Sequence, residues 1–203
     1  MRAWGKLISA RKFKSALSAL HSTEASQLLE FAVALPLLVV FVVGIFDFGD
    51  AFNLKQKLNN AVREGARFAS SLPTNDLSQV GACNAPTSVC AIRDLVDSYL
   101  LAGRINDCSL STQSATWSAA TMTATFASGT GCPGTLTLKV EREYSFPETV
   151  TGATTTISVV STRVSLSYPY RWHFNRVIQF VAPGASYAGV TQISTDAIVS
   201  NMD

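Results

Sequence analysis

The sequence has few charged residues for its length. Only 15% of its 203 residues are Asp, Glu, Lys or Arg, whereas about 25% is usual in a soluble domain. The formal net charge is +2, and without residues 1–25 the chain has 11 basic and 13 acidic residues. Nucleic-acid binding depends on a surplus of Lys and Arg, which residues 26–203 lack. The composition therefore predicts no nucleic-acid partner.

Residues and motifs that support catalysis are also scarce. The chain has two histidines, and only His173 follows the N-terminal region. A Ser-His-Asp or Cys-His site would depend on it, yet residues 171–174, RWHF, are more typical of an amphipathic segment. There is no G-x-S-x-G motif, no phosphate-binding loop and no G-x-G-x-x-G motif between a strand and a helix. We therefore expect that the protein is not an enzyme and that it has no cofactor and no small-molecule substrate.

What the sequence does have is one long apolar run. From Phe31 to Phe46, sixteen consecutive residues have no charged or polar side chain, and Glu30 directly precedes them. If Asp47 is tolerated at the other end, residues 28–48 can cross a bilayer core of about 30 Å as a helix. A carboxylate at the lipid boundary costs free energy, so we expect Glu30 either to pair with a positive charge or to extend into the headgroups.

Basic residues before the apolar run predict its orientation. Residues 1–25 contain five Lys and Arg against one Glu, which by the positive-inside rule keeps this end in the cytoplasm and places the chain after residue 50 outside. A cleaved secretory signal is the alternative, with Gly49-Asp50-Ala51 as a weak cleavage site. Against it, the run exceeds the usual length of about 7–15 residues, and helical patterning continues through that site.

Four cysteines follow the apolar run: Cys83, Cys90, Cys108 and Cys132. An even number in an exported region favours two disulfides. Three pairings are possible, and we favour Cys83–Cys90, which closes a short loop, together with Cys108–Cys132. Zinc is the alternative, but the spacing contains no C-x-x-C pair. We expect no metal site.

The helix that begins in the apolar run is predicted to extend well beyond it. Apolar residues recur at three- and four-residue steps over 52–69, and Pro73 is a plausible stop, which gives a helix at about 24–71. Pro36 lies inside this helix and predicts a kink or local unwinding. The outer half should pack on a folded domain, with Leu58, Val62 and Ala66 against the apolar face of the strands.

The remainder changes from a helical period to a period of two. A short helix fits 88–102, and strands fit 115–127, 134–145 and 154–168, with a strand or short helix at 187–200 and a hairpin loop at 127–134. Clean alternation indicates antiparallel strands with one covered face. The predicted fold class is α+β, in which a long N-terminal helix, transmembrane and then amphipathic, packs on an antiparallel β-sheet.

Two stretches resemble the N-terminal motif of TadE-like proteins, minor pseudopilins of the tight-adherence (Tad, or Flp) type IV pilus systems. They are ASQLLEFAVALPLL and GIFDFGDAFNLKQKLNNAVREGARFAS, within about residues 25–70. The matching parts are Glu30-Phe31, Leu35-Pro36, Phe48-Gly49 and Arg63-Glu64-Gly65-Ala66-Arg67, and Tyr168-Pro169-Tyr170 is also similar to the family. The resemblance implies a pilin-like fold.

In this family a prepilin peptidase cuts just before the apolar helix. Carried over, the cut falls between Ala25 and Ser26, with Ala25 in place of the usual Gly. The resemblance also implies that Glu30 pairs with the new amino group of Ser26 on a neighbouring subunit. The implied organisation is a cleaved leader at 1–25, a long helix at 26–71 and an exported, disulfide-containing, strand-rich domain at 72–203.

The function implied by the resemblance is that of a minor pseudopilin in the bacterial inner membrane, needed to assemble a Tad pilus for adherence or secretion. The implied partners are the lipid bilayer, the prepilin peptidase, other pilin-like subunits and the Tad assembly machinery. The alternative is a bitopic membrane protein with an extracytoplasmic binding domain and no role in a filament.

Overall fold

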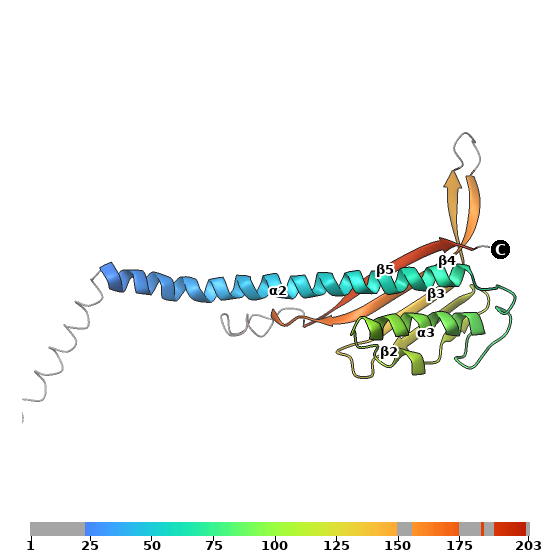
Figure 1. The fold of residues 1–203 in the computed structure, drawn as a ribbon, viewed down its shortest axis with the longest axis horizontal. Helices are drawn as coiled ribbons and strands as arrows, with labels where there is room; N and C mark the ends of the chain where they lie inside the picture. Colours follow the sequence, from blue (N-terminus) through green and yellow to red (C-terminus); the bar gives the residue numbers. More distant parts are fainter. Residues whose placement is uncertain (1–22, 150–155, 175–183, 185–188, 202–203) are drawn as a thin grey trace, which may run out of the picture. The chain divides into compact units, whose positions relative to one another are not determined.

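The structure, a computed structural model, describes residues 23–149, 156–174, 184 and 189–201. These residues form an α+β fold, as the sequence predicts (Figure 1). The elements are α2 (Thr23–Ser70), α3 (Thr87–Ala102), the 3-10 helix η1 (Leu110–Thr112), β1 (Thr116–Ser118), β2 (Thr123–Ser128), β3 (Leu136–Thr149), β4 (Thr156–Arg171) and β5 (Val190–Ser200).

The chain divides into two compact units. The first consists of Met1–Asp47 and His173–Tyr187, and the second of Phe48–Trp172 and Ala188–Asp203. Helix α2 contributes its apolar part to the first unit and its amphipathic part to the second.

Helix α2 runs for 48 residues, within one residue of the predicted bounds at either end. It stays α-helical through Pro36, and the kink or local unwinding expected there stays a prediction. After Ser70 the backbone tightens, because the N–H groups of Ser71 and Leu72 donate to carbonyls only three residues back, at 3.1 and 3.2 Å. Pro73 has no N–H to continue the helix.

The five strands form one antiparallel sheet in which each strand pairs with its neighbours along the chain, in the order β1-β2-β3-β4-β5. The single strand expected at 115–127 is wrong, since this stretch is a hairpin in which Trp117 lies opposite Ala124. Its turn contains no Gly or Pro, and Met122 instead adopts a positive φ of 44°. The hairpin loop at 127–134 and a strand within 187–200 are as expected.

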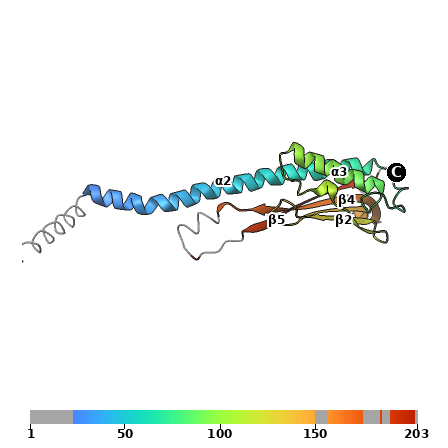
Figure 2. The same ribbon diagram turned by 90° about the horizontal axis from the view of Figure 1, so that it is seen from below.

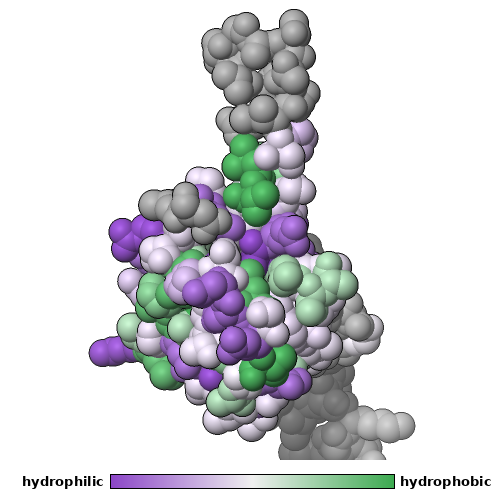
Figure 3. Space-filling view, turned by 90° about the vertical axis from the view of Figure 1, so that its right-hand side faces the viewer, coloured by the Kyte–Doolittle hydropathy of each residue, from purple (hydrophilic) through white to green (hydrophobic). Residues whose placement is uncertain are grey.

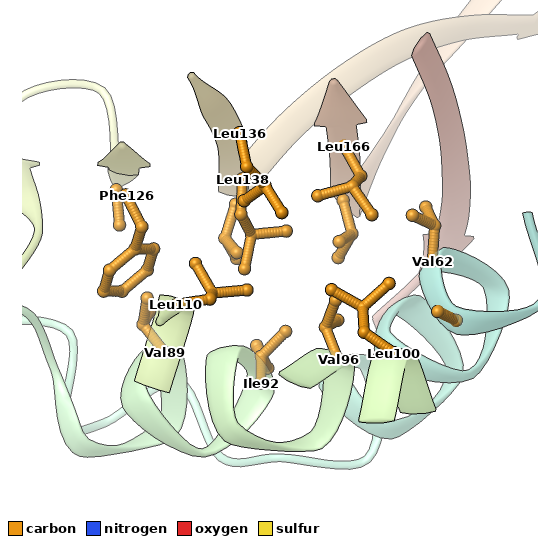
Figure 4. Packing of buried hydrophobic residues seen from close by; sticks show 14 of the residues in the cluster. Val62, Val89, Ile92, Val96, Leu100, Leu110, Phe126, Leu136, Leu138 and Leu166 are labelled. Carbon is orange, nitrogen blue, oxygen red and sulfur yellow. The ribbon is translucent and has the colours of Figure 1, made fainter. Parts of the chain in front are cut away.

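One face of the sheet is covered by α3 and the outer part of α2 (Figure 2). Leu58, Val62 and Ala66 are fully buried in this core, as predicted. Figure 4 shows the cluster, in which side chains from α3 and η1 meet those of the strands. Its labelled members are Val62, Val89, Ile92, Val96, Leu100, Leu110, Phe126, Leu136, Leu138 and Leu166.

Gly65 allows α2 and α3 to approach closely. A Cβ added at Gly65 would lie 2.8 Å from Cγ2 of Val96, nearer than side-chain atoms normally come. A glycine in a helix interior costs about 1 kcal/mol relative to Ala, and the close packing of the two helices explains its presence here.

Both disulfides have the pairing that the sequence favours. Cys83 is bonded to Cys90 and Cys108 to Cys132, with Cα–Cα distances of 5.9 and 5.4 Å. The second bond, which closes the larger disulfide loop of residues 108–132, ties the loop after α3 to the β2–β3 hairpin. The side chain of Asn106 donates to the carbonyl of Gly131 at 2.8 Å and reinforces this connection.

Candidate assembly and anchoring site

The apolar part of α2 is almost entirely exposed in the structure. Leu28, Val33, Ile45 and Phe46 each expose 71% of their surface. This helix is long and apolar enough to cross a membrane, and none of its most apolar 18-residue window is buried. Because an exposed apolar surface of this extent is not stable in water, it indicates a contact with lipid or with other apolar helices.

Glu30 and the predicted cleavage site lie at the beginning of α2. The Ala25–Ser26 bond is within the first turns of the helix, and Glu30 follows Ser26 by four residues, about one helical turn. Ser26 and Glu30 are exposed. Among the residues that the structure describes, none forms an ion pair or a hydrogen bond with the carboxylate of Glu30. This carboxylate is therefore open to a partner outside the described part of the chain.

Asp47, at the other end of the apolar run, has partners within its own chain. Its side chain is buried, with 3% of the residue exposed. Oδ2 accepts a hydrogen bond from the backbone N–H of Phe174 at 2.9 Å, and Oδ1 lies 3.3 Å from Nδ1 of His173. His173, the histidine on which a catalytic site would depend, thus lies against a helix side chain. Local sequence patterns missed this contact because more than 120 residues separate its partners.

Arg142 is a buried charge at the end of α2 that the sequence analysis did not single out. It lies on β3 where the pairing with β4 shifts register, and 1% of its surface is exposed. Its guanidinium donates to the carbonyls of Ala69, Leu72 (2.9 Å) and Pro73 (3.3 Å). A cation near the C-terminal carbonyls also complements the helix dipole. The sequence does indicate this burial, because side chains alternate along a strand and Arg142 continues the inward-facing series of residues 136, 138 and 140.

A pair of carboxylates lies beneath the end of α3. Asp97 is buried, and burial raises its pKa from 3.8 to about 6, with the negative charge of Asp107 adding to the increase. Burial also raises the pKa of Tyr168, and Asp107 contributes there too. Within the described ranges, no group of three or more His, Cys, Asp or Glu residues is placed to hold a metal ion.

The face of the sheet away from the helices is mainly polar, although Ile198 is also exposed there. Lys139 pairs with Glu141 at 2.8 Å and Arg163 with Asp196 at 3.2 Å. In the end-on view of Figure 3, polar side chains are mixed with scattered groups of apolar ones. These partly exposed ion pairs contribute little to stability, and they keep this face compatible with water.

These features define a class of protein, in which an exposed apolar helix continues into the core of an α+β domain. Residues 25–67 match the family model described as TadE-like protein. The match includes Ser26, Glu30, Asp47 and Gly65, and over these residues it confirms the resemblance found in the sequence, whereas Tyr168-Pro169-Tyr170 lies outside it. Together with the apolar helix, it fits a membrane protein associated with the Tad pilus system. No curated protein and no solved structure matches the chain.

Proposed function

We propose that this chain is a membrane-anchored, non-enzymatic minor pseudopilin that is needed to assemble a Tad-type pilus for adherence or secretion. Helix α2 spans the bacterial inner membrane through about residues 28–48, with its N-terminal end in the cytoplasm and the disulfide-bonded domain outside. A prepilin peptidase removes residues 1–25. The processed chain then associates with other pilin-like subunits and with the Tad assembly machinery.

The contrast between the two carboxylates that bracket the apolar run carries this proposal. They are 17 residues apart, or about 26 Å along the helix, and the described residues supply partners for Asp47 but none for Glu30. An ionised side chain costs about 2.5–3.5 kcal/mol at the bilayer centre and less near its edge. The amino group of Ser26 on a neighbouring subunit would offset this cost and at the same time set the register between subunits.

The position of the disulfides supports the proposed orientation. Both disulfides lie beyond residue 80, on the opposite side of the apolar run from the basic residues at 2–14. Disulfides form and persist in oxidising compartments outside the cytoplasm. The positive-inside rule and the disulfides therefore favour the same orientation.

Substitution of Glu30 tests the assembly role. Glu30→Gln keeps the size and polarity of the side chain and removes its charge, so the protein should still insert and form both disulfides. Recovery of pilin-like subunits with the tagged protein from detergent-solubilised membranes should fall about tenfold, the effect of losing about 1.4 kcal/mol of binding free energy. Asp50→Asn is the matched control, because Asp50 is also exposed on α2. Equal recovery with Glu30→Gln and wild type would refute the charge pair.

The N-terminus of the mature protein distinguishes the proposal from its alternatives. Mass spectrometry of membrane-extracted protein should find a chain that begins at Ser26. An uncut chain would instead favour a bitopic binding protein without a filament role, and a cut near Ala51 would favour a secreted protein. Ala25→Gly restores the residue usual before the cut and should process at least as fast, whereas a bulky Ala25→Leu should accumulate the uncut form.

A further inference from the structure

Asp47 is buried, whereas the residues next to it on α2 are exposed. Phe46 and Phe48, on either side of it, expose 71% and 61% of their surface, whereas Asp47 exposes 3%. Part of the cover comes from the beginning of the segment that joins β4 to β5, through the backbone N–H of Phe174 and the ring of His173. A hydrogen bond from a backbone N–H to a carboxylate is charge-assisted and stronger than one between neutral groups. Asp47 therefore holds the start of this connection against α2.

The ring of Phe174 lies deeper along α2 than Asp47 does. A Cβ added at Gly44 would be 3.5 Å from Cε2 of Phe174, so the ring rests on the helix at Gly44. Gly44 is two residues inside the apolar run, which ends at Phe46, and thus about 3 Å further into the membrane than the end of the run. If α2 spans the bilayer, the ring of Phe174 is at the outer boundary of the hydrocarbon.

Trp172, two residues earlier, belongs to a group of aromatic side chains. Its ring makes edge-on contacts with Phe48 and Tyr170, with centroid distances of 5.1 and 5.0 Å. The indole N–H donates to Oγ1 of Thr191, so its polar end is satisfied. Aromatic rings with an apolar body and a satisfied polar end are enriched at membrane–water interfaces. The neighbouring Arg171 is exposed and suits the phosphate groups of lipid headgroups.

We propose that the beginning of the β4–β5 connection is a second membrane contact, in which the ring of Phe174, clamped to α2 by Asp47, enters the outer interface of the bilayer together with the ring of Trp172, which packs on Phe48. The inference rests on the proposed anchoring by α2. It adds to that anchoring a contact made by the residues at the start of this connection.

Tryptophan quenching by lipid tests this contact. The chain has three tryptophans, so Trp4→Phe with Trp117→Phe leaves Trp172 alone, and Trp4→Phe with Trp172→Phe leaves Trp117 alone as the matched control. Each full-length variant is reconstituted at low density into phosphatidylcholine–phosphatidylglycerol vesicles whose lipids are brominated either near the headgroup or near the chain ends. Trp172 should be quenched by the bromines near the headgroup, whereas Trp117, on β1, should be quenched by neither lipid.

Variants of Asp47 then test the clamp. In the Trp172-only protein, Asp47→Ala should reduce quenching to the level of Trp117. Asp47→Asn, which retains an oxygen acceptor for the N–H of Phe174, and Asp50→Ala should both retain it. Resistance of the domain to protease in each variant shows that loss of quenching is not loss of folding. Undiminished quenching of Trp172 in Asp47→Ala would overturn the clamp.

A third single-tryptophan protein separates this inference from the proposed anchoring. Phe41→Trp, in a chain with no other tryptophan, should be quenched by the bromines near the chain ends if α2 spans the bilayer. A quenched Trp at 41 with an unquenched Trp172 would overturn the second contact and leave the anchor intact. Absence of quenching at both would overturn both. If quenching of Trp172 falls as the protein density in the vesicles rises, the aromatic group contacts a second copy of the chain instead of lipid. That result would also overturn the inference.

Discussion

Replacing Arg142 by Met tests whether the end of α2 depends on a buried guanidinium. Met keeps an unbranched apolar side chain and has neither charge nor N–H. Among the contacts of the described residues, the guanidinium donates to three carbonyls, and its removal affects these three carbonyls to different extents. Pro73 is exposed, so water can take the place of Arg142 there. The carbonyl of Ala69 still accepts a hydrogen bond from the N–H of Leu72 at 3.2 Å. Leu72 is only half-buried, so its own carbonyl is partly accessible to water.

The expected cost follows from these differences. Hydrogen bonds to a charged group are worth about 1.5–3 kcal/mol each, and water replaces part of this total. Relief from burying a charge, which costs several kcal/mol, offsets a further part. We expect the free energy of unfolding to fall by about 2 kcal/mol. With an m-value of about 2 kcal/mol per molar urea, this lowers the urea midpoint by about 1 M.

The measurement is a urea titration of the full chain in detergent micelles, followed by near-ultraviolet circular dichroism of the domain. Arg67→Met is the matched control, because Arg67 lies in the last turn of the same helix with 76% of its side chain exposed. Loss of its ion pair with Glu64 should change stability by less than about 0.5 kcal/mol. An unchanged or higher midpoint for Arg142→Met would show that the desolvation cost outweighs the hydrogen bonds, and would refute the reasoning.

Three further changes should affect the domain in the same titration. Gly65→Ala should destabilise it by about 1–2 kcal/mol, since its Cβ would collide with α3, whereas Gly49→Ala, in open space, should stabilise it; effects of equal sign would contradict this packing. Replacing Cys108 and Cys132 by Ser should cost about 3 kcal/mol through the entropy of the larger disulfide loop, and free thiols in oxidised wild-type protein would sink this prediction. Because the pKa of Asp97 is raised to about 6 in the folded protein, the folded state binds this proton more tightly than the unfolded chain. The contribution of Asp97 to stability should therefore be greatest below about pH 4 and decline as the pH rises to 6. Asp97→Asn should remove on the order of 1–3 kcal/mol of that decline. If the free energy of unfolding depends on pH in the same way in the variant and in wild type, Asp97 is not its cause.

Local periodicity was sufficient to predict most of the fold. Helix α2 and helix α3 were placed within a residue or so of their bounds, because each has a continuous stripe of apolar residues at helical spacing. The long strands β3 and β4 were recognised by alternation, although both begin two residues later than predicted and extend beyond the predicted C-terminal ends. The β1–β2 hairpin was missed, because its turn uses Met122 at a positive φ rather than the Gly, Asn or Pro that normally marks such a turn.

The candidate site was only partly predictable, for a different reason. Glu30 and Asp47 are conspicuous in the sequence, because each interrupts or adjoins an apolar run. The partner of Asp47 is a backbone N–H, which every residue except proline possesses, so residue types give no indication that Phe174 supplies it. Arg142 lies between these cases. Its position in the alternation of β3 predicts an inward-facing side chain, whereas its charge predicts an exposed one.

The order of the strands has a consequence for how the chain folds. Among β1–β5, every strand pairs with the one before or after it in the chain. Pairing of nearby segments requires little loop-closure entropy, and chains rich in such contacts fold fast. As the chain emerges with its N-terminus first, each strand can be added to the edge of the previous one. Strand β4 remains an open edge until β5 arrives, so the interval between these two strands is when the nascent domain is most exposed to pairing with another chain.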